Sequence, residues 1–303
     1  MFKKFLLCFL LLTSNIFSQK INIELRKCSL RNGCICNCEW TKQVDCLKIR
    51  DDGSCCFSCC CKSSKNNQPT QLKLEYYCPN KDDFIQAYGN PILLNRGWIN
   101  KGSGGVATKS SFNILGGFIE YDIDVSKVEP GVNANIYSIS PIFPSSGFTQ
   151  KFYCDGQKKD SEWCTEIDWI ESNGNCLGAS TLHMIQGPGS GCTAWGCNVH
   201  YEYNGKTKFH MKIQYSKEGK ITIYRDEQVI TEFKPKPTEK EVQNLLEQYS
   251  NRGAVIYSSL WKGWVPLQQK CKMDGNLENS EFKIENLKIY GKLIQGPKLN
   301  GNC

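Results

Sequence analysis

Beyond about residue 77, hydrophobic and polar residues alternate in short runs that are separated by turn residues. Alternation with a period of two is typical of β-strands with one buried face. The clearest runs are GFIEYDIDV (117–125), KFHMKIQY (208–215), KITIYR (220–225) and FKIENLKIY (282–290). Many short strands within about 225 residues predict one all-β domain over residues 77–303, a sandwich or jelly roll.

Two turn signals and one helical pattern interrupt these strands. Asn204-Gly205 predicts a tight hairpin turn, and residues 217–219 predict a longer turn between two strands. In residues 237–249, PTEKEVQNLLEQY, a capping box precedes apolar residues that recur every three or four positions, which predicts an α-helix. We expect this helix to lie on the surface of the domain.

The first residues of the chain follow a different pattern. Two lysines precede an apolar run from Phe5 to Leu12, and small polar residues surround Ser14 and Ser18. This layout is typical of a cleaved secretory signal, and the run is far shorter than the ~20 residues that span a bilayer. We therefore expect a signal peptide over residues 1–18 and a secreted, extracellular protein with no membrane partner after cleavage.

Cysteine is the most unusual feature of the composition. The chain has 19 cysteines, and removal of Cys8 with the signal leaves 18, ten between Cys28 and Cys61 and eight between Cys78 and Cys303. An even number in each region suits disulfides in an oxidising compartment. We expect two parts, each of which closes its own bridges.

Residues 19–62 contain few large apolar side chains and cannot build an ordinary hydrophobic core. We therefore expect a small disulfide-rich N-terminal module, held together by cross-links. Its CxC and CxxC spacings are also compatible with zinc or copper, although the compartment favours disulfides. The polar stretch that follows predicts a linker over residues 63–76.

Charge and short motifs exclude several classes of function. The formal charge is +7, or +5 without the two lysines of the signal, and the remaining Lys and Arg are scattered. No nucleic-acid partner is expected, while an affinity for anionic glycans stays open. No HExxH or GxSxG motif occurs, and we expect no cofactor, no metal site and no serine nucleophile. We also expect a monomer.

The segment WCTEIDWIESNGN (163–175) carries the candidate chemistry, with Glu166, Asp168 and Glu171 in one apolar strand. Alternation puts Glu166 and Asp168 on one face, and a β-bulge around Trp169-Ile170 would return Glu171 to that face. Trp169 should then point into the core. Crowded carboxylates repel one another, and the segment contains no cation, which favours a catalytic role. Retaining glycoside hydrolysis uses two such groups ~5–5.5 Å apart, one as nucleophile and one as acid/base.

With the STLH sequence at 180–183, this segment resembles a clan of β-jelly-roll glycosidases. The clan unites glycoside hydrolase family 7 cellulases with family 16 laminarinases. Family 7 has counterparts, in the same order, of DIDVSKVEPGVNANIYSISP (122–141), Tyr153-Cys154-Asp155 and AVIYSSLW (254–261). The resemblance runs discontinuously from about residue 117 to 264 and implies a concanavalin-like β-jelly-roll sandwich.

Residue by residue, the resemblance implies Glu166 as the nucleophile, Asp168 as its helper and Glu171 as the acid/base. It also implies that His183 is an auxiliary group near the site and that Trp261 is a sugar-stacking platform. On the residues alone, His183 could instead be a structural strand histidine.

Three further aromatic residues complete the expected substrate-binding set. Trp264 could be a second platform or a core residue, and Trp195, in the glycine-rich segment 187–197, is expected to line the cleft. Tyr153 is expected to contact substrate.

The chain is shorter than a typical family 7 catalytic domain, which suggests an open cleft and internal cutting. Leu182 stands where the family has proline before the histidine, and the Trp-rich segment of family 16 is absent. We expect a secreted, retaining endo-β-glucanase that acts on β-1,4 or mixed β-1,3/1,4 glucan. Two alternatives stay open: a glucan transglycosylase with the same site, and a non-catalytic, lectin-like or wall-structural protein on the same fold.

Overall fold

The computed structural model describes residues 47–49, 55–57, 73–156, 164–183, 197–233, 240–299 and 303. The chain divides into two units, residues 1–69 and 70–303. In the first unit, β1 (Leu47–Ile49) pairs antiparallel with β2 (Cys55–Phe57). The expected signal peptide and the side chains of the expected cysteine-rich module lie outside the described residues.

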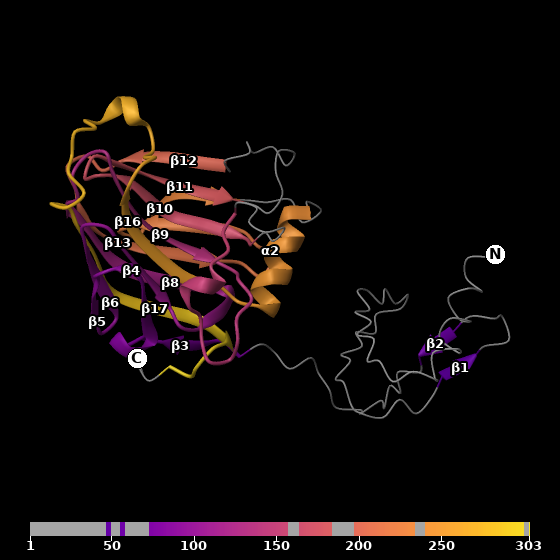
Figure 1. The fold of residues 1–303 in the computed structure, drawn as a ribbon. Helices are drawn as coiled ribbons and strands as arrows, with labels where there is room; N and C mark the ends of the chain where they lie inside the picture. Colours follow the sequence, from indigo (N-terminus) through magenta and orange to yellow (C-terminus); the bar gives the residue numbers. More distant parts are fainter. Residues whose placement is uncertain are drawn as a thin grey trace, which may run out of the picture. The chain divides into compact units, whose positions relative to one another are not determined.

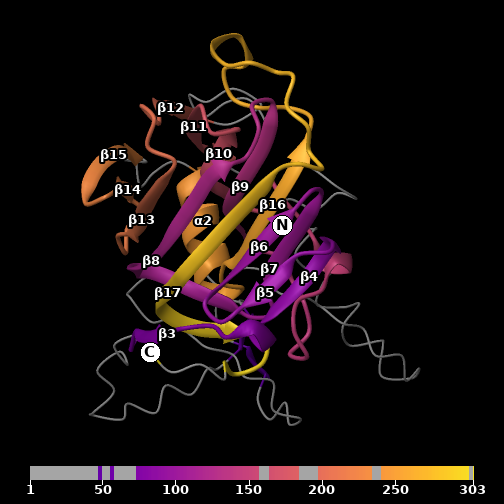
Figure 2. The same cartoon turned by 90° about the vertical axis from the view of Figure 1, so that its left-hand side faces the viewer.

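The second unit is a sandwich of two antiparallel sheets (Figure 1). In the seven-stranded sheet the order is β12 (Cys197–Glu202), β11 (Leu177–His183), β10 (Glu166–Asn173), β9 (Val132–Ile139), β16 (Val255–Lys262), β7 (Gly104–Thr108) and β4 (Phe84–Gly89). In the eight-stranded sheet it is β15 (Gln228–Phe233), β14 (Ile221–Arg225), β13 (Lys208–Tyr215), β8 (Ser111–Lys127), β17 (Glu281–Gln295), β6 (Gly97–Lys101) and β5 (Ile92–Leu94), with β3 (Glu75–Tyr77) paired to β17. Figure 2 shows β8 and β17 side by side in this second sheet. The predicted all-β jelly-roll fold is confirmed.

Cross-sheet contacts of buried tryptophans tie the two layers together. Trp169 of β10 is fully buried and donates its indole N–H to the Tyr215 hydroxyl of β13, 2.8 Å away. Trp98 of β6 donates to the Ser258 hydroxyl of β16 at 3.1 Å. A buried indole N–H needs such a partner, because leaving it unpaired costs free energy. The inward direction predicted for Trp169 is confirmed.

Helices are few in the described part of the chain. They are η2 (Lys81–Asp83), η3 (Gln150–Phe152), η4 (Gln268–Lys270) and α2 (Lys240–Asn251). The predicted helix is present as α2, at one end of the strands (Figure 1). It is more than a surface decoration, because Leu245 and Tyr249 are buried in the main core and the Tyr249 hydroxyl pairs with that of Ser138 at 2.6 Å.

The two predicted turns have different outcomes. Residues 217–219 join β13 to β14, which pair as expected. Asn204 and Gly205 adopt positive φ angles of 52° and 77° and form a tight turn. However, β12 pairs with β11 and β13 pairs with β8, so this turn carries the chain from one sheet to the other. Local sequence specifies the turn, whereas the buried faces of the flanking strands decide their partners.

Within the described residues of the second unit, three disulfides join Cys78 to Cys303, Cys154 to Cys164 and Cys176 to Cys271. The first links the two ends of the unit, the second closes a short loop before β10, and the third links the turn after β10 to the segment after β16. The first strand of the unit, β3, begins two residues before the expected domain start at 77.

Candidate active site

A β-bulge in β10 brings the predicted carboxylates to one face. The register of β10 shifts between Asp168 and Ile170 against β9, and between Asp168 and Glu171 against β11. Trp169 and Ile170 are both fully buried in the main core, so two consecutive side chains point inward. Glu171 therefore returns to the face that holds Glu166 and Asp168. The predicted bulge is confirmed.

Neighbouring strands hold Glu171 from both sides. Its Oε2 accepts a hydrogen bond from the Thr181 hydroxyl of β11 at 3.0 Å, and its Oε1 accepts a longer one from the Asn133 amide of β9 at 3.4 Å. The residue is 8% exposed. Glu171 is therefore nearly buried and is held by hydrogen bonds that come from within the sheet.

Glu166 is held in a different way. It is the first residue of β10 and is partly exposed, and its Oε2 accepts a hydrogen bond from the backbone N–H of Gly156 at 2.8 Å. Asp168, two residues further along, is 2% exposed and lies opposite Thr181 of β11 and Tyr137 of β9. The three carboxyl groups thus differ in burial and in the elements that surround them.

Aromatic side chains cover the sheet beside Glu166. Ring contacts join Tyr137 and Tyr153 to Tyr257, with centroids 5.1 and 5.2 Å apart, and the hydroxyls of Tyr137 and Tyr153 lie 3.0 Å apart. Burial raises the pKa of both Tyr137 and Tyr153 well above its ordinary value, and the nearby Glu166 adds to the shift. Both phenols therefore stay neutral next to this carboxylate. The expected role of Tyr153 in substrate binding stays a prediction.

Two predicted site residues, His183 and Trp195, lie partly or wholly outside the described residues. His183 ends β11, and its backbone pairs opposite Glu166 of β10, as a residue near the site should. Its side chain lies outside the described residues, as does the whole of Trp195. Their roles stay predictions.

The last two predicted site residues, Trp261 and Trp264, lie close to Asn133, which donates a hydrogen bond to Glu171. Trp261 of β16 is partly exposed, stands opposite Asn133 of β9, and lays its ring against Gly263. Trp264 is 47% exposed, which resolves the alternatives for this residue in favour of the surface. Its carbonyl oxygen accepts a second hydrogen bond from Asn133, at 3.1 Å.

A row of polar residues that was not among the predicted site residues lies on the same face of the sheet as the three carboxylates. Asn133, Thr181 and Asn135 belong to this row, and the Asn135 side-chain oxygen accepts hydrogen bonds from the N–H and the hydroxyl of Ser259, at 2.8 and 2.7 Å. A signal for them is present, since Asn133 and Asn135 alternate with small or apolar residues in the VNANIY sequence of β9. Alternation of this kind puts both amides on one face of a buried strand.

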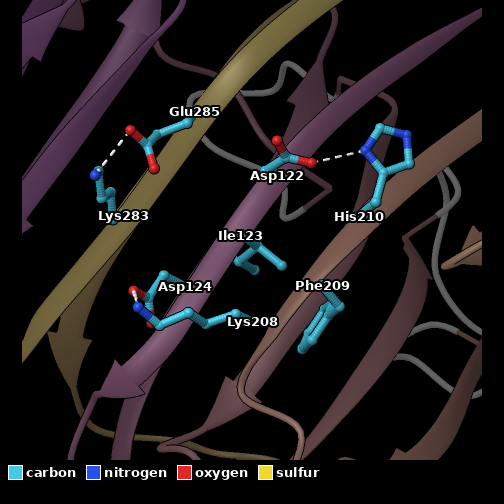
Figure 3. Close-up of a pocket in the computed structure, with 8 residues that line it drawn as sticks. All are labelled: Asp122, Ile123, Asp124, Lys208, Phe209, His210, Lys283 and Glu285. Carbon is cyan, nitrogen blue, oxygen red and sulfur yellow. Dashed lines mark hydrogen bonds and ion pairs between the residues drawn. The ribbon is translucent and has the colours of Figure 1, made fainter.

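The outer face of the eight-stranded sheet carries a depression whose charges are already paired (Figure 3). It is lined by Asp122, Ile123, Asp124, Lys208, Phe209, His210, Lys283 and Glu285. Three pairs span 2.8 Å each: Lys208 with Asp124, His210 with Asp122, and Lys283 with Glu285. These contacts give the depression a structural explanation.

Among the residues that the structure describes, no His, Cys, Asp and Glu side chains form a group of three or more that could hold a metal ion. No helix in this described part of the chain is long and apolar enough to cross a membrane.

Comparison with family models and with curated proteins found no match. Among solved structures, a laminarinase from Flavobacterium sp. UMI-01 is similar, with 12% identity and a TM-score of 0.48 over 73% of this chain and 100% of that one. A cellobiohydrolase from Melanocarpus albomyces has 13% identity and a TM-score of 0.47 over 70% and 80% of the two chains. The Crh5 transglycosylase has 14% identity and a TM-score of 0.43 over 72% and 84%. At these identities the likeness is one of fold.

Proposed function

We propose that this protein is a secreted endo-β-glucanase that hydrolyses β-1,4 or mixed β-1,3/1,4 glucan with retention of anomeric configuration. One observation carries the proposal: the bulge in β10 places Glu166, Asp168 and Glu171 on one face of the sheet. Charged carboxyl groups on one face of a strand repel one another, and retaining glycoside hydrolysis uses such a group of carboxyls.

In the proposed reaction, Glu166 attacks the anomeric carbon and forms a glycosyl-enzyme ester while Glu171 protonates the departing glycosidic oxygen. Glu171 then takes a proton from water, which attacks the ester, releases the sugar and regenerates Glu166. The N–H of Gly156 stabilises the anion that a nucleophile requires. The burial of Glu171 favours the neutral form that a general acid requires.

Three other residues support these two roles. Asp168 lies buried between the pair, and three adjacent carboxyls do not all ionise easily, which helps Glu171 to keep its proton while Glu166 is charged. Trp261 and Trp264 are at least partly exposed and lie next to Asn133, which donates to Glu171, and the apolar C–H faces of sugars stack on such rings. The proposed substrate is therefore a neutral β-glucan chain, bound through stacking and hydrogen bonds.

The first experiment measures reducing-sugar release by the secreted protein from carboxymethylcellulose, barley mixed-linkage glucan and laminarin. We expect activity on the first two, loss of that activity in Glu166→Gln, and proton NMR spectra in which the β-anomer of the product appears first. A rapid fall in viscosity would support internal cutting. Binding without turnover on all three polymers would contradict the enzyme and favour a lectin-like protein.

A second assay separates hydrolysis from transfer. A fluorescent cello-oligosaccharide is added as acceptor together with unlabelled glucan. If water resolves the glycosyl-enzyme, the label stays in small products and reducing sugar accumulates. Growth of the label into long chains with little new reducing sugar would show a transglycosylase instead.

A further inference from the structure

The two proposed catalytic glutamates are oriented by different parts of the molecule. Glu171 takes its hydrogen bonds from Thr181 and Asn133, which belong to the strands on either side of β10. Glu166 stands at the very start of β10 and takes a hydrogen bond from Gly156, which lies outside both sheets. The sheet itself therefore does not explain how the Gly156 amide comes to face the Glu166 carboxylate.

A disulfide places Gly156 beside the start of β10. Cys154 is bonded to Cys164, which precedes Glu166 by two residues, and both cysteines are buried. The backbone N–H of Cys164 also donates to the carbonyl oxygen of Asp155, 3.1 Å away. The bridge and this hydrogen bond hold residues 154–156 against the segment that enters β10.

The residue before the bridge is anchored as well. The Tyr153 ring packs against Tyr257 of β16 and its hydroxyl pairs with Tyr137 of β9. These contacts belong to a second hydrophobic cluster, which lies on the open face of the seven-stranded sheet, the face that carries the three carboxylates. Tyr153 packs against this cluster, which is made of Ala107, Tyr137, Ile139, Phe143, Phe148, Val255 and Tyr257. The chain on the N-terminal side of Gly156 is thus fixed to the sheet that carries the carboxylates.

We propose that the Cys154–Cys164 bridge and the Gly156 amide form the positioning element for the Glu166 carboxylate. A hydrogen bond from a backbone N–H favours the ionised carboxylate and restricts its rotation, and both effects serve a nucleophile. The other two bridges among the described residues lie elsewhere, one at the ends of the unit and one at the turn after β10. The catalytic part of this inference rests on the proposed role of Glu166.

The test compares Gly156→Pro, which removes the N–H, with Gly156→Ala, which keeps it. We expect Gly156→Pro to lower kcat on mixed-linkage glucan about tenfold with KM nearly unchanged, and Gly156→Ala, which keeps the hydrogen bond, to lose clearly less. In carbon-13 NMR titrations, the carboxyl signal of Glu166, assigned with Glu166→Gln, should titrate about one pH unit higher in the proline variant.

A second pair of variants tests the bridge itself and keeps the backbone of Gly156. Cys154→Ser/Cys164→Ser should raise the Glu166 titration midpoint, as Gly156→Pro does, and should lower kcat. Both quantities are measured at a temperature below the melting temperature of the variant. Cys176→Ser/Cys271→Ser, which removes a bridge of longer sequence separation, should lower the melting temperature and leave the Glu166 midpoint in place.

An equal Glu166 midpoint in Gly156→Pro and Gly156→Ala, or an equal shift in both cysteine pairs, would overturn the positioning role. The titration does not require turnover. A protein that shows the expected shift but releases no sugar would therefore contradict the proposed hydrolase and leave the positioning role supported.

Discussion

The partners described for carboxylates differ between the two faces of this sandwich. On the outer face of the eight-stranded sheet, Glu120 pairs with Lys288 at 3.0 Å and Asp124 with Lys208 at 2.8 Å. On the open face of the seven-stranded sheet, the partners described above for Glu166 and Glu171 are amide and hydroxyl groups. A paired lysine holds a carboxylate in its charged form, whereas neutral donors leave it able to accept a proton or attack a carbon. The hydrogen bonds described for Glu166 and Glu171 thus differ in kind from the lysine pairs of the outer face.

The largest contrast is expected between Glu171 and an outer-face acid. Glu171→Gln removes the general acid and should lower kcat/KM on mixed-linkage glucan by about 10²–10⁴-fold. Asp122→Asn, whose partner is His210 on the outer face, should leave the rate unchanged. An aryl glycoside with a good leaving group needs little protonation, so its cleavage should suffer much less in Glu171→Gln. Equal losses with both substrates would contradict the acid role.

Threonine hydroxyls that donate to glutamate on the two faces allow a matched comparison. Thr181→Val removes a donor to Glu171 and should lower kcat/KM about tenfold. Because this donor favours the anion, its loss should move the basic limb of the pH–rate profile to higher pH. Thr222→Val removes a donor to Glu232 at 3.3 Å on the eight-stranded sheet and should leave the profile in place. A pH–rate profile that shifts in Thr222→Val but not in Thr181→Val would contradict the comparison.

Exposed aromatic residues provide a smaller test. Trp264→Ala should raise KM for glucan about three- to tenfold with little change in kcat, because one stacking contact contributes about 0.5–1.5 kcal/mol. Tyr76→Ala, at an exposed ring on the eight-stranded sheet, should change neither constant. Steady-state kinetics on defined oligosaccharides measure both values. A loss in kcat alone would argue against a stacking role for Trp264.

The smallest effect concerns stability on the outer face. Burial opposes the ionisation of Asp124, but hydrogen bonds from Lys208 and Ser126 outweigh it and lower its pKa. The stabilisation is therefore present above the unfolded value, near 3.9, and is lost as pH falls through the lower folded value. Asp124→Asn should cost less than about 1 kcal/mol at pH 7, since the pair is largely solvated. Urea unfolding at pH 7 and pH 3 checks this, and an undiminished cost at pH 3 would contradict it.

Local pattern was enough to predict much of β10. Alternation and one extra residue at Trp169-Ile170 placed three carboxylates on one face, because side-chain direction in a strand depends on near neighbours. The same reasoning identified strands β8, β13, β14 and β17 and the helix α2. It could not decide the partners of β12 and β13 around the Asn204-Gly205 turn, since pairing depends on which faces are buried.

The sequence by itself thus determined several central strands, the bulge and the face that carries Glu166, Asp168 and Glu171. Only the tertiary structure decided which groups hold them. Asn133 lies 38 positions before Glu171, and the Gly156 amide meets Glu166 through a disulfide and a cluster built on other strands. Such partners depend on strand order, register and bridge connectivity, which arise from burial over the whole domain. Alternation in β9 indicates that Asn133 and Asn135 share a face, but no local pattern shows which carboxylate they meet.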